Sequence, residues 1–156
     1  MSDLAITTLG GLRVANVQAM GGYHSCIHVR TEDKDSIMFD CGVLLYEGVS
    51  AKWVFISHGH VDHIGAAIQH ARARALSHSP ATYFVPEEVV EPLMRAHEAY
   101  EKLDGRAIAF HVQVMRPFES VLVGKRKQFR VQAFPTGMYM CDVMLKGFTF
   151  AVARQY

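Results

Sequence analysis

The feature that most constrains the fold is a change of hydrophobic period between residues 53 and 75. The run Trp53–Ile56 is continuously apolar, which is typical of a strand buried on both faces. After a short histidine-rich loop, apolar residues recur at helical spacing: Ile64, Ala67, Ile68, Ala71 and Ala75. We therefore expect an amphipathic helix over Ile64–Leu76. A strand, a loop and a helix in this order predict an α/β domain.

Short apolar runs divided by glycine pairs and charged turns come before this unit. Runs of this kind predict consecutive antiparallel strands. The expected strands are Leu4–Thr7, Leu12–Val17, Tyr23–Val29 and Ser36–Phe39.

A second helix and further strands are expected downstream. Pro86 and the acidic residues after it favour a helix start, so we predict a helix over Glu87–Leu103, with Pro92 in its first turn and Gly105 behind its end. The remaining expected strands are Ala81–Val85, Ile108–Met115, Ser120–Val123, Phe129–Phe134 and Phe148–Val152.

Length and composition indicate one globular domain over residues 1–156. Half of the residues are hydrophobic and 20% are charged, which excludes a disordered chain. We find no apolar stretch long enough for a membrane span and no secretory signal profile, so a soluble intracellular protein is expected. The three cysteines are widely spaced, which favours reduced thiols over a disulfide framework.

Charge is divided unevenly along the chain. Residues 1–104 carry 8 Lys/Arg and 13 Asp/Glu, a net charge of −5, whereas residues 105–156 carry 8 and 2, a net charge of +6. A basic last third fits an anionic partner such as nucleic acid, but also a solvated face or a contact with the acidic part. Within it, Lys125, Arg126 and Lys127 form a basic turn that is a candidate contact for an RNA backbone.

Four side chains that commonly bind metals lie within six residues, at the point where the buried strand gives way to the helix. They are His58, His60, Asp62 and His63, in the pattern HxHxDH. The first two histidines can address one cation and the last two residues another, and this donor set suits Zn²⁺, with Mn²⁺ or Fe²⁺ as alternatives. The other interpretation is that these are polar loop residues that cap the helix. We expect hydrogen-bonded structural roles for His70 and His97.

Together with Phe39-Asp40-Cys41-Gly42 and Gly22-Tyr23-His24-Ser25-Cys26, this motif resembles the metallo-β-lactamase superfamily, and most closely its ribonuclease Z branch. The resemblance implies an αββα sandwich built from two βα halves, of which this chain matches the N-terminal half. It implies that two zinc ions are bound, one by His58 and His60 and the other by Asp62 and His63. Asp62 is also implied as a catalytic general base, and Asp40 as an outer carboxylate that orients a ligating imidazole.

The sequence departs from the family pattern in its second half. The branch places another histidine after a strand like Phe129–Phe134, where this chain has Pro135-Thr136-Gly137-Met138. No histidine follows His111, and Asp142 is the only late carboxylate apart from Glu119. We therefore expect weak or partial metal occupancy, in a domain that is either a fragment or completed by another chain.

Three functions remain open at this point. The resemblance favours a zinc-dependent phosphodiesterase that acts on tRNA 3′ ends. A catalytically silent half-domain that binds RNA or a partner chain fits the absent late ligands, and a thioester hydrolase of glyoxalase II type shares the same loop. Because half a sandwich leaves one sheet face open, we also expect a homodimer in which each copy covers the other.

Overall fold

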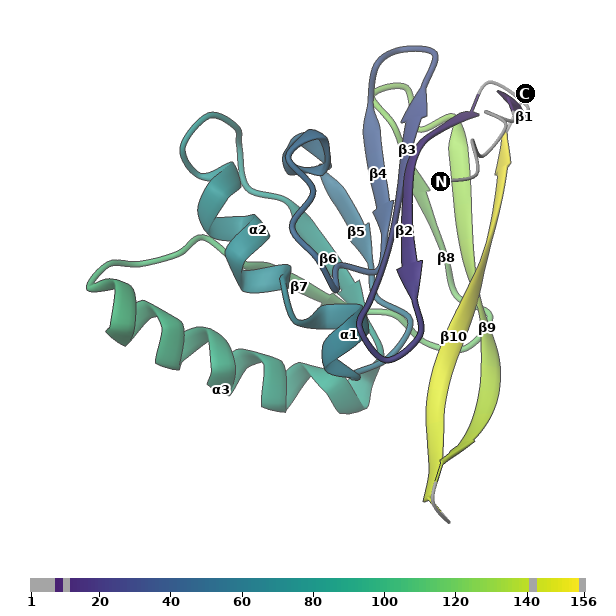
Figure 1. Cartoon of the computed structure of the whole chain (residues 1–156). Helices are drawn as coiled ribbons and strands as arrows, with labels where there is room; N and C mark the ends of the chain where they lie inside the picture. Colours follow the sequence, from purple (N-terminus) through teal and green to yellow (C-terminus); the bar gives the residue numbers. More distant parts are fainter. Residues whose placement is uncertain (1–7, 10–11, 141–142, 155–156) are drawn as a thin grey trace.

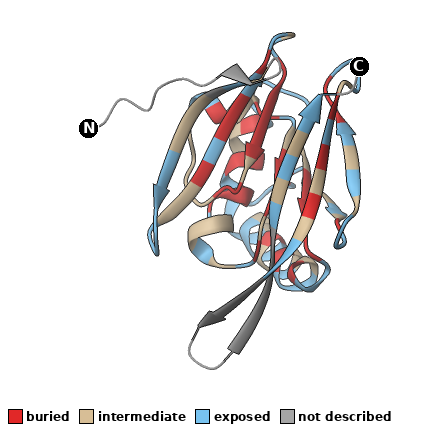
Figure 2. Ribbon diagram, turned by 90° about the vertical axis from the view of Figure 1, so that its right-hand side faces the viewer, coloured by how far each residue is buried: buried red, intermediate tan, exposed pale blue. Residues whose placement is uncertain are grey.

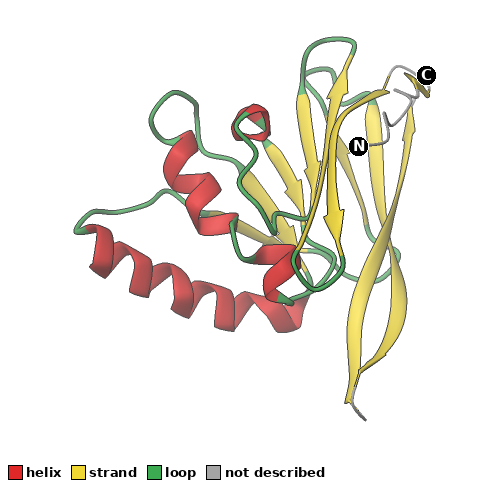
Figure 3. Cartoon of the chain, in the orientation of Figure 1, coloured by secondary structure: helices red, strands yellow, loops and turns green. Residues whose placement is uncertain are grey.

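The computed structural model describes residues 8–9, 12–140 and 143–154, and it has three layers (Figure 1). A helix layer lies on one face of a seven-stranded sheet, and a three-stranded sheet lies on the other face (Figure 3). The larger sheet contains β1 (Thr8–Leu9), β2 (Leu12–Met20), β3 (His24–Thr31), β4 (Ser36–Phe39), β5 (Trp53–Phe55), β6 (Thr82–Val85) and β7 (His111–Val114). The smaller sheet contains β8 (Ser120–Val123), β9 (Phe129–Met140) and β10 (Val143–Arg154).

The seven strands follow one another in sequence order, but their direction changes at β4. Strands β1 to β4 pair antiparallel, whereas β4, β5, β6 and β7 pair parallel. Parallel neighbours need crossover connections, and the helices of this chain provide them on one face of the sheet. The expected mixed sheet is confirmed, while the expected strand at Leu4–Thr7 lies outside the described residues.

The first predicted helix is interrupted. In place of one helix over Ile64–Leu76, the chain forms α1 (Val61–Ile64) and α2 (Ala67–Arg74). The break occurs where the Ala66 N–H donates to the carbonyl of Cys41 instead of to its own helix. A tertiary hydrogen bond thus overrides the local apolar period.

The second predicted helix is α3 (Glu87–Asp104), which ends at Gly105 in the left-handed conformation. Pro92 was expected in the first turn but lies in the second, where it has no N–H to donate to the preceding turn. A short 3₁₀ helix, η1 (Glu47–Ser50), precedes β5. Among the described residues, none of these helices is long and apolar enough to cross a membrane.

Two hydrophobic cores lie on the two faces of the larger sheet. The core on the helix side includes Val54, Ile56, Tyr83, Val85, Ala67, Ala71, Val89 and Leu93. The core between the sheets joins Ile37, Phe55 and Phe84 of the larger sheet to Val123, Phe129, Val131 and Ala133 of the smaller one. Buried and more exposed residues alternate along β8 and the first half of β9, as a sheet with one covered face requires (Figure 2).

The second core corrects the expected open face. We predicted that the sheet would have one uncovered side, but β8 to β10 of the same chain cover it. The inward residues of these strands have a period of two, and this period allows them to form a separate sheet. The homodimer stays a prediction, because its stated reason no longer applies to the larger sheet.

His70 joins three elements behind the sheet, and His97 is also hydrogen-bonded as predicted. The fully buried His70 imidazole donates from Nε2 to the Gly48 carbonyl at 3.0 Å and accepts the Tyr83 hydroxyl at Nδ1, 2.6 Å away. Burial lowers the pKa of His70 to about 4. The neutral ring thus ties α2 to η1 and β6.

We expect the stability of the fold to decrease as the pH falls from about 6.5 to about 4. Over that interval the unfolded chain protonates His70 and the folded chain does not, so this group alone removes about 3 kcal/mol of unfolding free energy. His70→Gln can keep both hydrogen bonds without titrating. Urea unfolding at pH 7 and pH 4.5 should therefore show a smaller pH-dependent loss in the variant. An equal loss in both proteins would contradict this role.

Candidate metal centre

The candidate site lies at the carboxyl ends of two neighbouring parallel strands. Asp40 follows β4 and donates its backbone N–H to the Phe55 carbonyl of β5 at 2.8 Å. Ser57 and the histidine motif follow β5, so the parallel pairing places the two loops side by side. Ligand sites in open α/β sheets form at this end of the strands.

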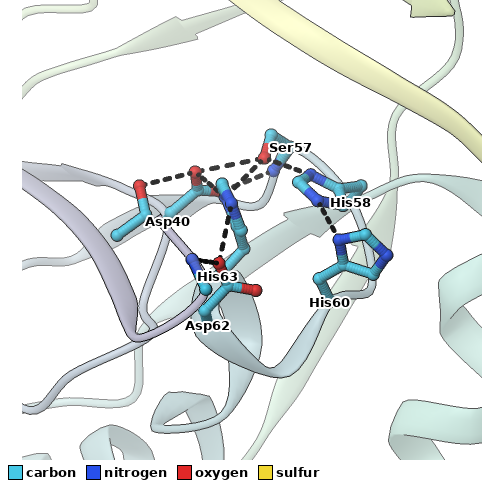
Figure 4. Close-up of polar contacts among 8 residues, drawn as sticks. Asp40, Ser57, His58, His60, Asp62 and His63 are labelled. Atoms are coloured by element: carbon cyan, nitrogen blue, oxygen red, sulfur yellow. Dashed lines mark hydrogen bonds and ion pairs between the residues drawn. The ribbon is translucent and has the colours of Figure 1, made fainter. Parts of the chain in front are cut away.

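Asp40 is the centre of the polar network in Figure 4. Its backbone has φ +58°, a left-handed conformation that costs a non-glycine residue about 1–2 kcal/mol. In that conformation the buried carboxylate accepts the Ser57 N–H at 2.8 Å with Oδ1, and His63 Nδ1 at 2.7 Å with Oδ2. Oδ2 also accepts the hydroxyls of Ser57 at 3.1 Å and Ser25 at 3.4 Å.

Ser57 extends this network to a second histidine. Its hydroxyl donates to Asp40 and lies 2.9 Å from His58 Nδ1 and 3.2 Å from His63 Nδ1. Since an ionised carboxylate only accepts, both imidazoles are held with the proton on Nδ1. Sequence reasoning identified Asp40 but missed Ser57, whose position directly before the motif was the available signal.

The four motif residues form two pairs. His58 Nε2 lies 3.0 Å from His60 Nδ1, and His63 Nε2 lies 3.6 Å from Asp62 Oδ2. Two ligands of one tetrahedral Zn²⁺ lie about 3.3 Å apart when each bond is about 2.0–2.1 Å, so both separations fit a shared cation. Among the residues that the structure describes, no three such groups gather around one point. The residues thus fit two half-filled metal sites better than one complete site.

The two network histidines differ in their affinity for protons. Hydrogen bonding to Asp40 raises the pKa of His63, although partial burial opposes this shift. Burial lowers the pKa of His58, and the neighbouring His63 and His60 lower it further. His58 is therefore the more readily available of the two as a neutral ligand.

Two glycines let neighbouring loops approach the motif. A Cβ atom at Gly42 would lie 1.6 Å from the Asp62 carbonyl oxygen, so only glycine fits there. The Gly22 N–H, in the β2–β3 turn, donates to Asp62 Oδ2 at 3.1 Å. The Cys41 N–H donates to the His63 carbonyl at 2.7 Å. The backbone of the motif is thereby held from the side of β3 and β4.

The structure does not bring the basic turn to this site. Lys125, Arg126 and Lys127 follow β8 and face the β3–β4 turn, at the opposite end of β4 from Asp40. Lys125 donates its backbone N–H to Asp35 at 2.7 Å, and Arg126 lies 3.8 Å from Asp33. This arrangement matches the alternative in which basic residues contact the acidic part of the chain. The RNA contact at this turn stays a prediction.

The expected position of a further histidine is occupied by regular strand. Residues 135–138 continue β9 and pair with residues 145–148 of β10. Cys141 and Asp142 lie outside the described residues.

Comparisons with known proteins place this geometry in a wider group. No family model matches the chain. The tRNase Z TRZ1 of Arabidopsis thaliana is 30% identical over 119 residues, which cover 76% of this chain and 41% of that protein. The nuclear ribonuclease Z of Triticum aestivum is 30% identical over 122 residues, 76% of this chain and 65% of its own length. The chain thus spans less than two thirds of each of these relatives.

Solved structures resemble the fold. The crystal structure of the short form of human tRNase Z aligns with a TM-score of 0.59 at 20% identity, over 85% of this chain and 57% of that one. The metallo-β-lactamase fold protein YhfI from Bacillus subtilis aligns with a TM-score of 0.60 at 16% identity, over 90% and 56%. At these identities the likeness concerns the fold.

We expect Gly42→Ala to destabilise the protein by about 1–3 kcal/mol, because the new methyl group must displace the Asp62 backbone. Gly21→Ala is the matched control, since a Cβ at Gly21 meets nothing within 4 Å. Urea unfolding of the two variants checks this difference. Equal stabilities would show that the motif backbone is not held against Gly42.

Proposed function

We propose that this chain, a member of the metallo-β-lactamase superfamily related in sequence to the tRNase Z proteins, is the metal-binding half of a ribonuclease Z-like hydrolase. The fold and the resemblance predicted from the sequence agree with the matched proteins. The observation that carries the proposal is the Asp40 network, which orients two imidazoles of the motif at once.

The four motif residues have separate roles in this proposal. His58 and His60 hold one divalent cation, and Asp62 and His63 hold the other. When bound, two such cations lower the pKa of water and neutralise negative charge on a phosphodiester. Asp40 keeps the proton of His63 on Nδ1, and Ser57 does the same for His58, so that each Nε2 presents a lone pair. Gly22 fixes the Asp62 carboxylate, which orients the attacking water.

RNA, and in particular the 3′ end of a tRNA precursor, is the substrate that the relatives' names suggest. The site of this chain supplies two ligands per cation, and a stable site needs more. The missing ligands must then come from outside this sequence, either from another chain or from further protein. We infer that the isolated chain binds metal weakly and does not cleave RNA on its own.

A catalytically silent binding module is the second candidate function. It is favoured by residues 135–138, which form plain strand without a histidine where the branch would place one. In that case the Asp40 network serves the local fold alone. Metal binding distinguishes the two functions.

Calorimetric titration with Zn²⁺ is expected to show weak binding that depends on the network. Asp40→Asn and Ser57→Ala should each weaken it by about tenfold or more, because misoriented imidazoles bind poorly, and Ser57→Thr should restore it by keeping the hydroxyl. His78→Ala is the control, since His78 is exposed and lies outside the network. Titrations that are unchanged by Asp40→Asn and by His58→Ala would contradict the proposed metal centre.

An activity assay separates the half-site from a complete enzyme. A precursor tRNA with a 3′ trailer, incubated with the chain and Zn²⁺ or Mn²⁺, should remain uncleaved. Cleavage that is lost in His60→Ala would show that the site is complete without further ligands. Two tightly held zinc ions per chain would lead to the same conclusion.

A further inference from the structure

A cavity of about 810 Å³ lies between the helices, beside the histidine pair. Its floor is formed by α1 and the start of α2, and its wall by α3. His58 and His60 line one end, and Tyr100 lines the other. Because Glu88 and Tyr100 are twelve residues apart on α3, the cavity extends for about 18 Å along that helix.

Contacts near both ends keep the two helical segments in place. At the motif end, a Cβ on Gly59 would lie 3.3 Å from Val89, so the histidine loop rests directly on α3. At the far end, Arg72 of α2 forms an ion pair with Asp104 of α3 at 2.6 Å. The space between these contacts belongs to the fold and is of the size that proteins use for small ligands.

The walls of this cavity are mainly aliphatic. Ile64, Ile68, Val89 and Leu93 line it, and small Ala96 leaves room between them. Glu88 is the one carboxylate among the described lining residues, and none of those residues is a lysine or an arginine. Such a lining favours an apolar, uncharged group and repels a phosphate chain.

We infer that this cavity binds the aliphatic acyl group of a neutral ester or thioester. Three observations point to this class of ligand: the aliphatic walls, the absence of cationic side chains from the described lining, and the continuity with His58 and His60. An acyl chain lying along α3 would place its carbonyl end at the histidine pair. This goes beyond the proposed function, because RNA supplies no group of this kind.

Displacement of a neutral fluorophore tests the inference without metal and without turnover. N-phenyl-1-naphthylamine should bind the metal-free protein with increased emission. The octanoyl thioester of N-acetylcysteamine should displace it, whereas N-acetylcysteamine and adenosine should not. Displacement by adenosine and not by the thioester would overturn the inference in favour of a nucleobase pocket. Failure of the fluorophore and the thioester to bind would also overturn it.

A matched pair of substitutions on α3 locates the bound probe. Ala96→Trp fills the cavity and should weaken thioester binding by about tenfold or more, as if about two methylene groups were denied burial. Ala99→Trp adds the same side chain at an exposed position of the helix outside the cavity and should leave binding unchanged. Equal affinities in both variants would contradict the assignment.

Sedimentation of the same samples distinguishes a cavity within one chain from an interface between copies. Probe binding should persist when the protein is diluted to a monomer. Binding that disappears together with a dimer would show that a second copy forms the pocket, and would overturn the inference. Because metal is absent throughout, failure here leaves the proposed hydrolase site to be judged by its own titration.

Discussion

The buried carboxylate of Asp40 is the interaction on which the site depends. It accepts hydrogen bonds from the Ser57 backbone, the Ser57 hydroxyl and the His63 ring, and it does so from a left-handed backbone conformation. Charge-assisted hydrogen bonds of this kind exceed the cost of that conformation. One side chain therefore fixes the relative position of two loops and the proton positions of two imidazoles.

The arrangement of the sheet makes this interaction possible. The change from antiparallel to parallel pairing at β4 places the ends of β4 and β5 next to each other, and the smaller sheet closes the opposite face of the larger one. The helices that return the chain for parallel pairing also enclose the aliphatic cavity. The polar half-site and the apolar cavity thus share the histidine loop, which provides His58 and His60 to both.

Much of this arrangement was predictable from the sequence, since it depends on local patterns. The apolar run before the motif, the helical period of α3 and the role of Asp40 beside His63 were all expected, and the structure contains each of them. The break between α1 and α2 was not, because it depends on a hydrogen bond from Ala66 to distant Cys41. The second sheet and the acidic partners of the basic turn were missed for the same reason, as both depend on contacts between distant parts of the chain.

The tautomers of His58 and His63 test the central claim most directly. Long-range ¹H–¹⁵N correlation spectra of the metal-free protein, recorded at a pH where both rings are neutral, report which nitrogen carries the proton. We predict protonated Nδ1 and bare Nε2 in both residues, and loss of this preference at His58 in Ser57→Ala. Protonated Nε2 at either histidine in the unsubstituted protein would contradict the account, because neither nitrogen would then be presented as a ligand by Asp40.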